Sequence, residues 1–296
     1  MEQKIKIFFY GILAVITFSL VLEACPAETS SSKPAANVYV LKFSGQVYYY
    51  KQDTDQNTEP VTGIFSSLLA GPQKFKGNLD VSDGDLGGTG EILGGKLNYI
   101  IDVEPPLSPI NEGGSLDDLK GMYEDLRFSP EDAKVAAVAL EITDSKDYSG
   151  LLKTLLVINV DNILKPTKYK LTSKTVNYVY VNKNLKITAD KKTFDNKDFN
   201  NDFDLSIPIP ISLTSEKINL SLKKGWNALC SEIQVDIPRE LLPVIYNPEL
   251  LSTLDLTALK LTGSLKMSVG DPGDLKWTLI PSPPPDIIPP EYLDFE

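Results

Sequence analysis

The side chains that could take part in chemistry are mainly carboxylates and tyrosines, because the 296-residue chain contains no histidine. Its absence removes the Ser-His and Cys-His nucleophile systems, His-ligated zinc and the usual general base at neutral pH. Asp and Glu total 40, and a glycoside hydrolase needs only two carboxylates about 5 to 10 Å apart. With so many acids such a pair arises by chance, so no catalytic residue is assigned.

One acidic segment has the composition of a calcium site. Its oxygen-bearing side chains are Asp195, Asp198, Asp202 and Asp204, interleaved with Asn196, Asn200 and Asn201. Carboxylate and amide oxygens are the ligands that calcium prefers, so the four aspartates are candidate calcium ligands if the loop folds back on itself. The alternative is an acidic hairpin loop without a cation. Asp80, Asp83 and Asp85 form a similar but weaker cluster, and no other cofactor is expected.

Aromatic residues offer a second kind of candidate site. The sequence places them at Tyr48, Tyr50, Tyr178, Tyr180 and Trp226, on segments that alternate like strands. Exposed rings on a sheet can stack on a sugar or contact a protein, so these five residues are candidate ligand-binding residues. The alternative is core or cross-strand packing.

The N-terminus predicts a secretory leader. Lys4 and Lys6 precede an apolar run from Ile7 to Leu22, which is the order of charged and apolar regions in a signal peptide. As a helix this run would be about 24 Å long, shorter than a bilayer core of about 30 Å, so a permanent membrane span is the weaker alternative.

Residues 22–25, Leu-Glu-Ala-Cys, resemble the lipobox of bacterial lipoproteins, with Glu23 where that motif normally has a small or uncharged residue. The resemblance implies that residues 1–24 are a lipoprotein signal peptide and that Cys25 receives lipid, with palmitate as an expected acyl chain. Ordinary cleavage beside Cys25-Pro26-Ala27 is the alternative.

The stretch after the leader has the composition of a tether. Residues 25–36 are rich in Ser, Pro and Ala and show no apolar periodicity. Two or three acyl chains on Cys25 would hold a domain on a bilayer, since each buried methylene contributes about 0.8 kcal/mol. The expected partner is therefore the membrane, through the lipid anchor. A net charge of -11 opposes binding to nucleic acid. Cys230 would be the only remaining thiol, packed as a small hydrophobic residue.

The rest of the chain predicts short strands. Apolar and polar residues alternate from Tyr39 to Tyr49 and from Leu259 to Val269, as in half-buried strands. Gly94-Gly95 and Lys223-Lys224-Gly225 predict hairpin turns. Helical spacing occurs at Ser115 to Leu126. Further strands are expected at 135–143, 155–160, 169–172, 176–181, 185–189, 218–222, 229–237 and 275–279.

Ten or so strands with one short helix predict a mainly β fold. The specific expectation is an antiparallel β-sandwich, jelly-roll or immunoglobulin-like. No long linker interrupts residues 37–280, which we expect to form one domain. Residues 281–296 are an acidic, proline-rich segment and predict an extended tail.

Three segments carry a further resemblance: Tyr178 to Thr188 (YVYVNKNLKIT), Leu220 to Asn227 (LSLKKGWN) and Leu275 to Trp277 (LKW). They resemble the YVYV(D/N)K, LKKGWN and LKW patterns of a family of uncharacterised bacterial cell-envelope lipoproteins. The resemblance spans about residues 88 to 280. It implies an envelope location and a β-rich fold, and it brings no activity or catalytic residues.

Together these features predict an exported, lipid-anchored protein of the cell envelope, on the outer membrane or the cell surface. Without a catalytic motif, a non-catalytic binding or structural module for protein or glycan is favoured. The alternative is an acid-residue-dependent glycoside hydrolase that acts on envelope polysaccharide.

Overall fold

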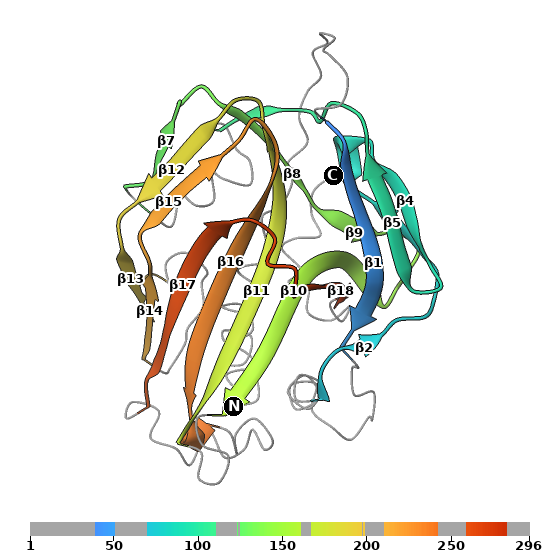
Figure 1. Cartoon of the computed structure of the whole chain (residues 1–296). Helices are drawn as coiled ribbons and strands as arrows, with labels where there is room; N and C mark the ends of the chain where they lie inside the picture. Colours follow the sequence, from blue (N-terminus) through green and yellow to red (C-terminus); the bar gives the residue numbers. More distant parts are fainter. Residues whose placement is uncertain are drawn as a thin grey trace, which may run out of the picture.

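A computed structural model describes residues 39–50, 70–110, 123, 125–160, 167–196, 198, 210–241 and 259–282 (Figure 1). Strands make up nearly all of the regular structure in these ranges, so the prediction of a mainly β protein is confirmed. Two short 3-10 turns, η1 (Gly84–Leu86) and η2 (Arg239–Leu241), accompany the strands. In the same ranges, no helix has the length and apolar character needed to cross a bilayer. The leader, the tether, almost all of the tail and most of the predicted helix lie outside the described residues.

Seven strands form a closed ring. They pair in the order β9-β10-β18-β1-β5-β4-β3, and β3 pairs with β9 to complete the circuit. In Figure 1 the ring occupies the right-hand side of the molecule, with β1 in blue. Its strands are β1 (Leu41–Tyr49), β3 (Leu79–Ser82), β4 (Thr89–Leu93), β5 (Lys96–Ile101), β9 (Leu140–Ile142), β10 (Tyr148–Val160) and β18 (Lys276–Pro281).

The same sheet continues beyond β10 as an open layer. The order runs β10-β11-β16-β17-β14-β13, while β8 pairs with β11, β6 with β8, and β2 with β1. These strands are β2 (Gln73–Lys74), β6 (Ser108–Pro109), β8 (Lys134–Val138), β11 (Lys168–Val181), β13 (Lys192–Asp195), β14 (Ile211–Ser215), β16 (Gly225–Pro238) and β17 (Leu261–Val269). A separate small sheet, ordered β15-β12-β7, consists of β15 (Ile218–Leu222), β12 (Leu185–Ala189) and β7 (Arg127–Ser129). We call the open layer and the small sheet together the layered region.

Two hydrophobic cores lie on opposite faces of β8 and of the C-terminal end of β11. The ring core contains Tyr180 and Ala136, whereas the core between the small sheet and the open layer contains Val179 and Ala137. Because side chains alternate along a strand, β8 and the end of β11 are buried on both faces and separate the two cores. This position explains why the sequence from 135 onward is apolar without alternation.

The expected antiparallel sandwich differs from this arrangement in two respects. Among the described strands, fifteen belong to one continuous sheet and three to the other, so only the small sheet forms a facing layer. Two pairings are parallel, β1 with β18 and β14 with β17. The physical reason is that β1 leaves β5 after Gln46 and pairs with β18 from Val47, which allows one sheet to curl and close.

Several local predictions can be compared directly with the structure. The Gly94-Gly95 hairpin is confirmed, because both glycines have positive φ (53° and 79°) and Leu93 pairs with Lys96. The predicted strand at 135–143 is instead two strands, β8 and β9, which enter different parts of the sheet. The two strands predicted at 169–172 and 176–181 are one continuous strand, β11.

The hairpin predicted at Lys223-Lys224-Gly225 is wrong in its pairing. A turn lies there, but β15 belongs to the small sheet and β16 to the large one, so the two strands do not pair. The Asn227 side chain closes this turn instead. Its Oδ1 accepts from Lys223 N at 2.9 Å, and its Nδ2 donates to the carbonyl oxygens of Lys223 (2.7 Å) and Gly225 (2.8 Å).

Candidate functional site

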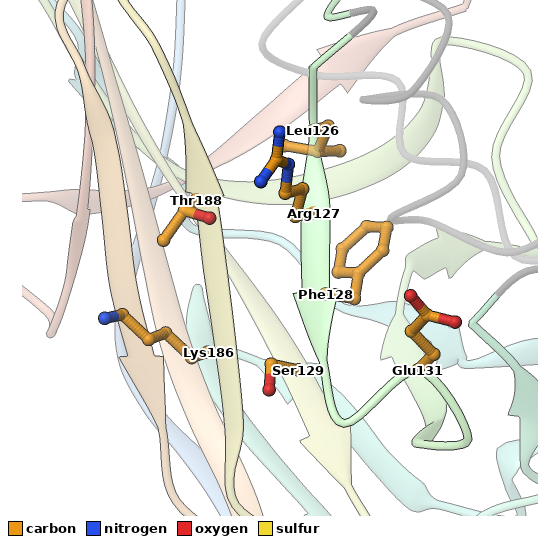
Figure 2. A pocket seen from close by; sticks show the side chains of 7 residues that line it. All are labelled: Leu126, Arg127, Phe128, Ser129, Glu131, Lys186 and Thr188. Atoms are coloured by element: carbon orange, nitrogen blue, oxygen red, sulfur yellow. The ribbon is translucent and has the colours of Figure 1, made fainter.

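A cavity of about 590 Å³ lies at β7, the edge strand of the small sheet. Figure 2 shows Lys186 and Thr188 projecting from β12, Arg127 and Ser129 from β7, and Glu131 from the segment that follows β7. In this view the Arg127 guanidinium lies on the Thr188 side of β7, and the Lys186 ammonium reaches away from β7. The full lining consists of Leu126, Arg127, Phe128, Ser129, Glu131, Lys186 and Thr188.

Strand pairing explains why these polar side chains share one face. Arg127 lies opposite Thr188 and Ser129 lies opposite Lys186, and directly opposed residues of an antiparallel pair project to the same side. The opposed pair between them, Phe128 and Ile187, points into the core and is buried. The burial of these apolar side chains therefore directs the four polar ones outward, around the cavity.

The electrostatics of this face are unusual for an acidic protein. The three strands of the small sheet contain Arg127 and Lys186 and no Asp or Glu. Two of the acids beside the sheet are paired with other lysines: Asp190 with Lys217 at 3.0 Å, and Asp132 with Lys183 at 2.8 Å. Asp125 accepts a hydrogen bond from Asp190 N, and Glu131 lines the cavity.

The strands of the small sheet carry two cations, and Glu131 is the one carboxylate in the described lining of the cavity. The Lys183 hydrogen bond and positive charge lower the pKa of the exposed Asp132. Neither Arg127 nor Lys186 forms an ion pair within the part of the chain that the structure describes.

The described lining of the cavity contains groups suited to binding a polar ligand. Two cations and two hydroxyls can hold an anionic or hydroxylated ligand. Glu131 is the only carboxylate among the described lining residues, whereas hydrolysis of a glycoside requires two. The chemistry that this lining supports is therefore recognition.

The five predicted aromatic residues lie elsewhere. Tyr178, Tyr180 and Trp226 pack against the ring core, with 5.4 Å between the ring centroids of Tyr180 and Trp226. Tyr180 is only 2% exposed, so its ring has no free face for a ligand. Burial, followed by the nearby Tyr39 and Glu104, raises the pKa of Tyr180 to about 12.

Tyr48 and Tyr50 are half-buried near the end of β1. The Lys276 ammonium lies 4.7 Å from the centroid of the Tyr48 ring, and burial raises the pKa of Tyr50 to about 12. For all five aromatic residues, the contacts agree with the packing alternative.

A polar cluster surrounds Tyr178 at the edge of the ring. Its hydroxyl donates to Asp271 Oδ2 at 2.9 Å, and Lys153 pairs with the same carboxylate. Burial by itself would raise the pKa of Asp271, but the hydrogen bonds from Lys153, Gly273 and Tyr178 outweigh it and lower that pKa. Burial and the neighbouring carboxylate raise the pKa of Tyr178, so the phenol stays protonated. Every charge in this cluster is satisfied internally, which indicates a structural role.

The predicted calcium ligands fall only partly within the described residues. Asp198 Oδ2 accepts a hydrogen bond from Asp195 N at 2.7 Å, and Lys192 lies 3.8 Å from its other oxygen. Asp202 and Asp204 lie outside the described residues. No group of three or more metal-ligating side chains occurs among the residues that were placed. Calcium binding at this loop stays a prediction.

In the weaker acidic cluster, Asp83 is buried beside Tyr99 of the ring core. Its carboxylate is 4% exposed and accepts from Gly88 N at 2.9 Å. Burial raises the pKa of Asp83 despite this and other hydrogen bonds. The adjacent Tyr99 hydroxyl is buried without a well-formed hydrogen bond to any described residue.

The prediction for Cys230 can be checked in the structure, whereas the prediction for Cys25 cannot. Cys230 is a free, buried thiol that packs with Val176 and Leu275, as predicted for a small hydrophobic residue. Burial raises its pKa, which keeps the thiol protonated and unreactive. Cys25 lies outside the described residues, so lipid attachment stays a prediction.

Sequence reasoning missed the cavity at β7. One signal was present: the chain has 29 basic residues, of which only Arg127 and Arg239 are arginine. Arg127 lies beside the alternating run Lys186-Ile187-Thr188 only because β7 and β12 pair, and pairing across about 60 residues leaves no mark on either segment.

Comparison with known proteins leaves the chain without an assigned family. No family model, no curated protein and no solved structure matches it. The resemblance to envelope lipoproteins therefore stays an expectation from sequence.

Proposed function

We propose that this protein is a lipid-anchored component of the cell envelope whose folded domain is a non-catalytic binding module. Its leader directs export, Cys25 carries the acyl chains, and residues 25–36 tether the domain to the outer membrane or the cell surface. The ligand, a glycan in our proposal, binds at the cavity of the small sheet.

The observation that carries the binding role is the lining of that cavity. Arg127, Lys186, Ser129 and Thr188 provide charge and hydrogen bonds on one face, with a single carboxylate nearby. A volume of about 590 Å³ falls within the range of about 300 to 1,000 Å³ for small-molecule sites. The hydrolase alternative gains no support, because it needs a second carboxylate at the same place.

Support for anchoring comes from the sequence, through the leader, the lipobox-like residues 22–25 and the tether. Tyr39 is the first described residue, and its carbonyl accepts a hydrogen bond from Trp226 Nε1 at 2.8 Å. Its ring also packs 5.6 Å from that of Tyr180. These two contacts connect the segment before β1 to β11 and β16, which pair with each other along a long ladder.

Anchoring is tested by detergent phase partition of the intact protein and of two single cysteine variants. Wild type and Cys230→Ala should enter the detergent phase, and Cys25→Ala should stay in the aqueous phase, because only Cys25 carries lipid. Mass spectrometry of the mature N-terminal peptide provides a second readout. An unmodified peptide that starts beyond Cys25 would contradict the proposal.

Binding is tested on a glycan array with a parallel hydrolysis assay on the retained glycans. We expect retention without release of shortened products, and weaker retention for the double variant Arg127→Gln with Thr188→Val. Product release would instead favour the hydrolase, and no retention of any glycan would reject the binding role.

A further inference from the structure

The geometry points to a carboxylate-bearing sugar, such as a uronate unit of an acidic glycan, as the ligand of the cavity at β7. This inference rests on the proposed binding function and specifies its ligand class. It is carried by the charge of the small sheet, by the position of Arg127 and by the hydroxyls around it.

The charge of the small sheet is opposite to that of the whole chain. Net charge is -11 overall, yet β7, β12 and β15 contain two cations and no acid. Two of the acids that flank the sheet, Asp190 and Asp132, have lysine partners, whereas Glu131 lies in the cavity lining itself. A local positive face on an acidic protein attracts anions to that face and repels them elsewhere.

Arg127 is the group best suited to hold a carboxylate. Its guanidinium is planar and can donate two parallel hydrogen bonds to the two oxygens of a carboxylate, which a lysine ammonium cannot do. Figure 2 shows this guanidinium on the Thr188 side of β7, whereas the Lys186 ammonium reaches away. Arg127 therefore holds the carboxylate, and Lys186 contributes through its longer-range charge.

The remaining groups favour a sugar as the part of the ligand that carries the carboxylate. Ser129 and Thr188 carry hydroxyls that both donate and accept, as recognition of sugar hydroxyls requires.

The test uses isothermal titration calorimetry on the full-length, lipidated protein in detergent micelles. The probes are trigalacturonate and its fully methyl-esterified form, which has the same sugar rings without the charges. Galactose 1-phosphate serves as the phosphate probe. The variants are Arg127→Gln, Arg127→Lys and, as a matched control, Arg239→Gln, which removes the only other arginine, also exposed.

We expect wild type to bind trigalacturonate at least about tenfold more tightly than the ester, since charge-assisted bidentate pairs are the strong ones. Arg127→Gln should abolish that preference, Arg127→Lys should lose part of it, and Arg239→Gln should keep it. Equal affinity for acid and ester, tighter binding of the sugar phosphate, or equal effects of the two Gln variants would each overturn the inference. If neutral glycans are retained on the array while trigalacturonate does not bind, the binding function stands and only the ligand class is wrong.

Discussion

The core of the ring and the core of the layered region contain different kinds of side chain. The ring core is rich in aromatic rings, with Phe43 packed 5.0 Å from Trp277, and it encloses the buried Asp83 beside Tyr99. The core of the layered region is mainly aliphatic, and the apolar residues of β7, β12 and β15 interdigitate there with the open layer.

This difference separates two tasks within one fold. The ring core holds the segment before β1, because the Tyr39 ring packs on Tyr180 and the Tyr39 carbonyl accepts a hydrogen bond from Trp226 Nε1. The aliphatic core holds the small sheet in place through its inner face alone, so its outer face is free to carry polar groups. Ligand recognition is therefore expected at the small sheet.

The largest expected effects come from truncating one core residue in each region. Ile187→Ala and Ile92→Ala each remove a fully buried side chain, and each should lower the free energy of unfolding by about 2 to 5 kcal/mol. Urea denaturation measures both. Only Ile187→Ala should also weaken glycan retention, because Ile187 lies between Lys186 and Thr188. If Ile187→Ala and Ile92→Ala weaken glycan retention equally while both remain folded, the glycan is not recognised by the small sheet in particular.

An intermediate effect is expected where the chain crosses from the small sheet to the large one. Asn227→Ala removes the three hydrogen bonds that close the turn between β15 and β16. The loss should lower the free energy of unfolding by about 1 to 3 kcal/mol, because the buried carbonyl of Gly225 and the two backbone groups of Lys223 lose their partners. Asn219→Ala, at an exposed position of β15, is the matched control and should change stability by less than about 0.5 kcal/mol. Equal losses would show that the Asn227 side chain does not maintain this crossing.

The smallest effect concerns the buried carboxylate of the ring. Because burial raises the pKa of Asp83, the folded state prefers the protonated form. Its contribution to stability is present below the pKa of the unfolded chain and is lost as pH rises through the folded pKa. Asp83→Asn keeps an acceptor for Gly88 N and removes the charge. The variant should therefore gain stability relative to wild type as pH rises from 3 to 7.

Thermal unfolding at several pH values measures this difference for Asp83→Asn. Asp80→Asn, a change at an exposed position of β3, controls for the loss of one negative charge. A constant difference between Asp83→Asn and wild type across the pH range would mean that the Asp83 carboxylate is not penalised by its burial.

The sequence predicted elements well where alternation and turn chemistry are local. The Gly94-Gly95 turn follows from two residues that tolerate positive φ. The shared face of Leu229 and Ile233 follows from spacing along one strand, and both lie in the same core. Strand β11 was divided in two because Ser173 and Thr175 interrupt its apolar pattern. Both are buried, and Thr154 Oγ1 donates to Lys174 O at 2.7 Å between them.

The candidate site was predicted less well than the fold. Aromatic residues such as Tyr180 looked available for a ligand, but they fill the ring core. The calcium ligands and Cys25 lie partly or wholly outside the described residues and stay predictions. The cavity was missed because its residues come from two short segments, neither of which carries a recognisable motif.

By itself, the sequence determined the mainly β character, the inward-facing residues of most strands and the position of the Gly94-Gly95 turn. Those properties depend on neighbours two or three residues apart, which a linear pattern records. Only the tertiary structure decided that the sheet closes into a ring and that β15 and β16 belong to different sheets. It also decided that Arg127 lies opposite Thr188. Every strand edge presents the same backbone donors and acceptors, whatever its side chains. Which two strands pair is therefore decided by how the faces of the sheets pack against one another.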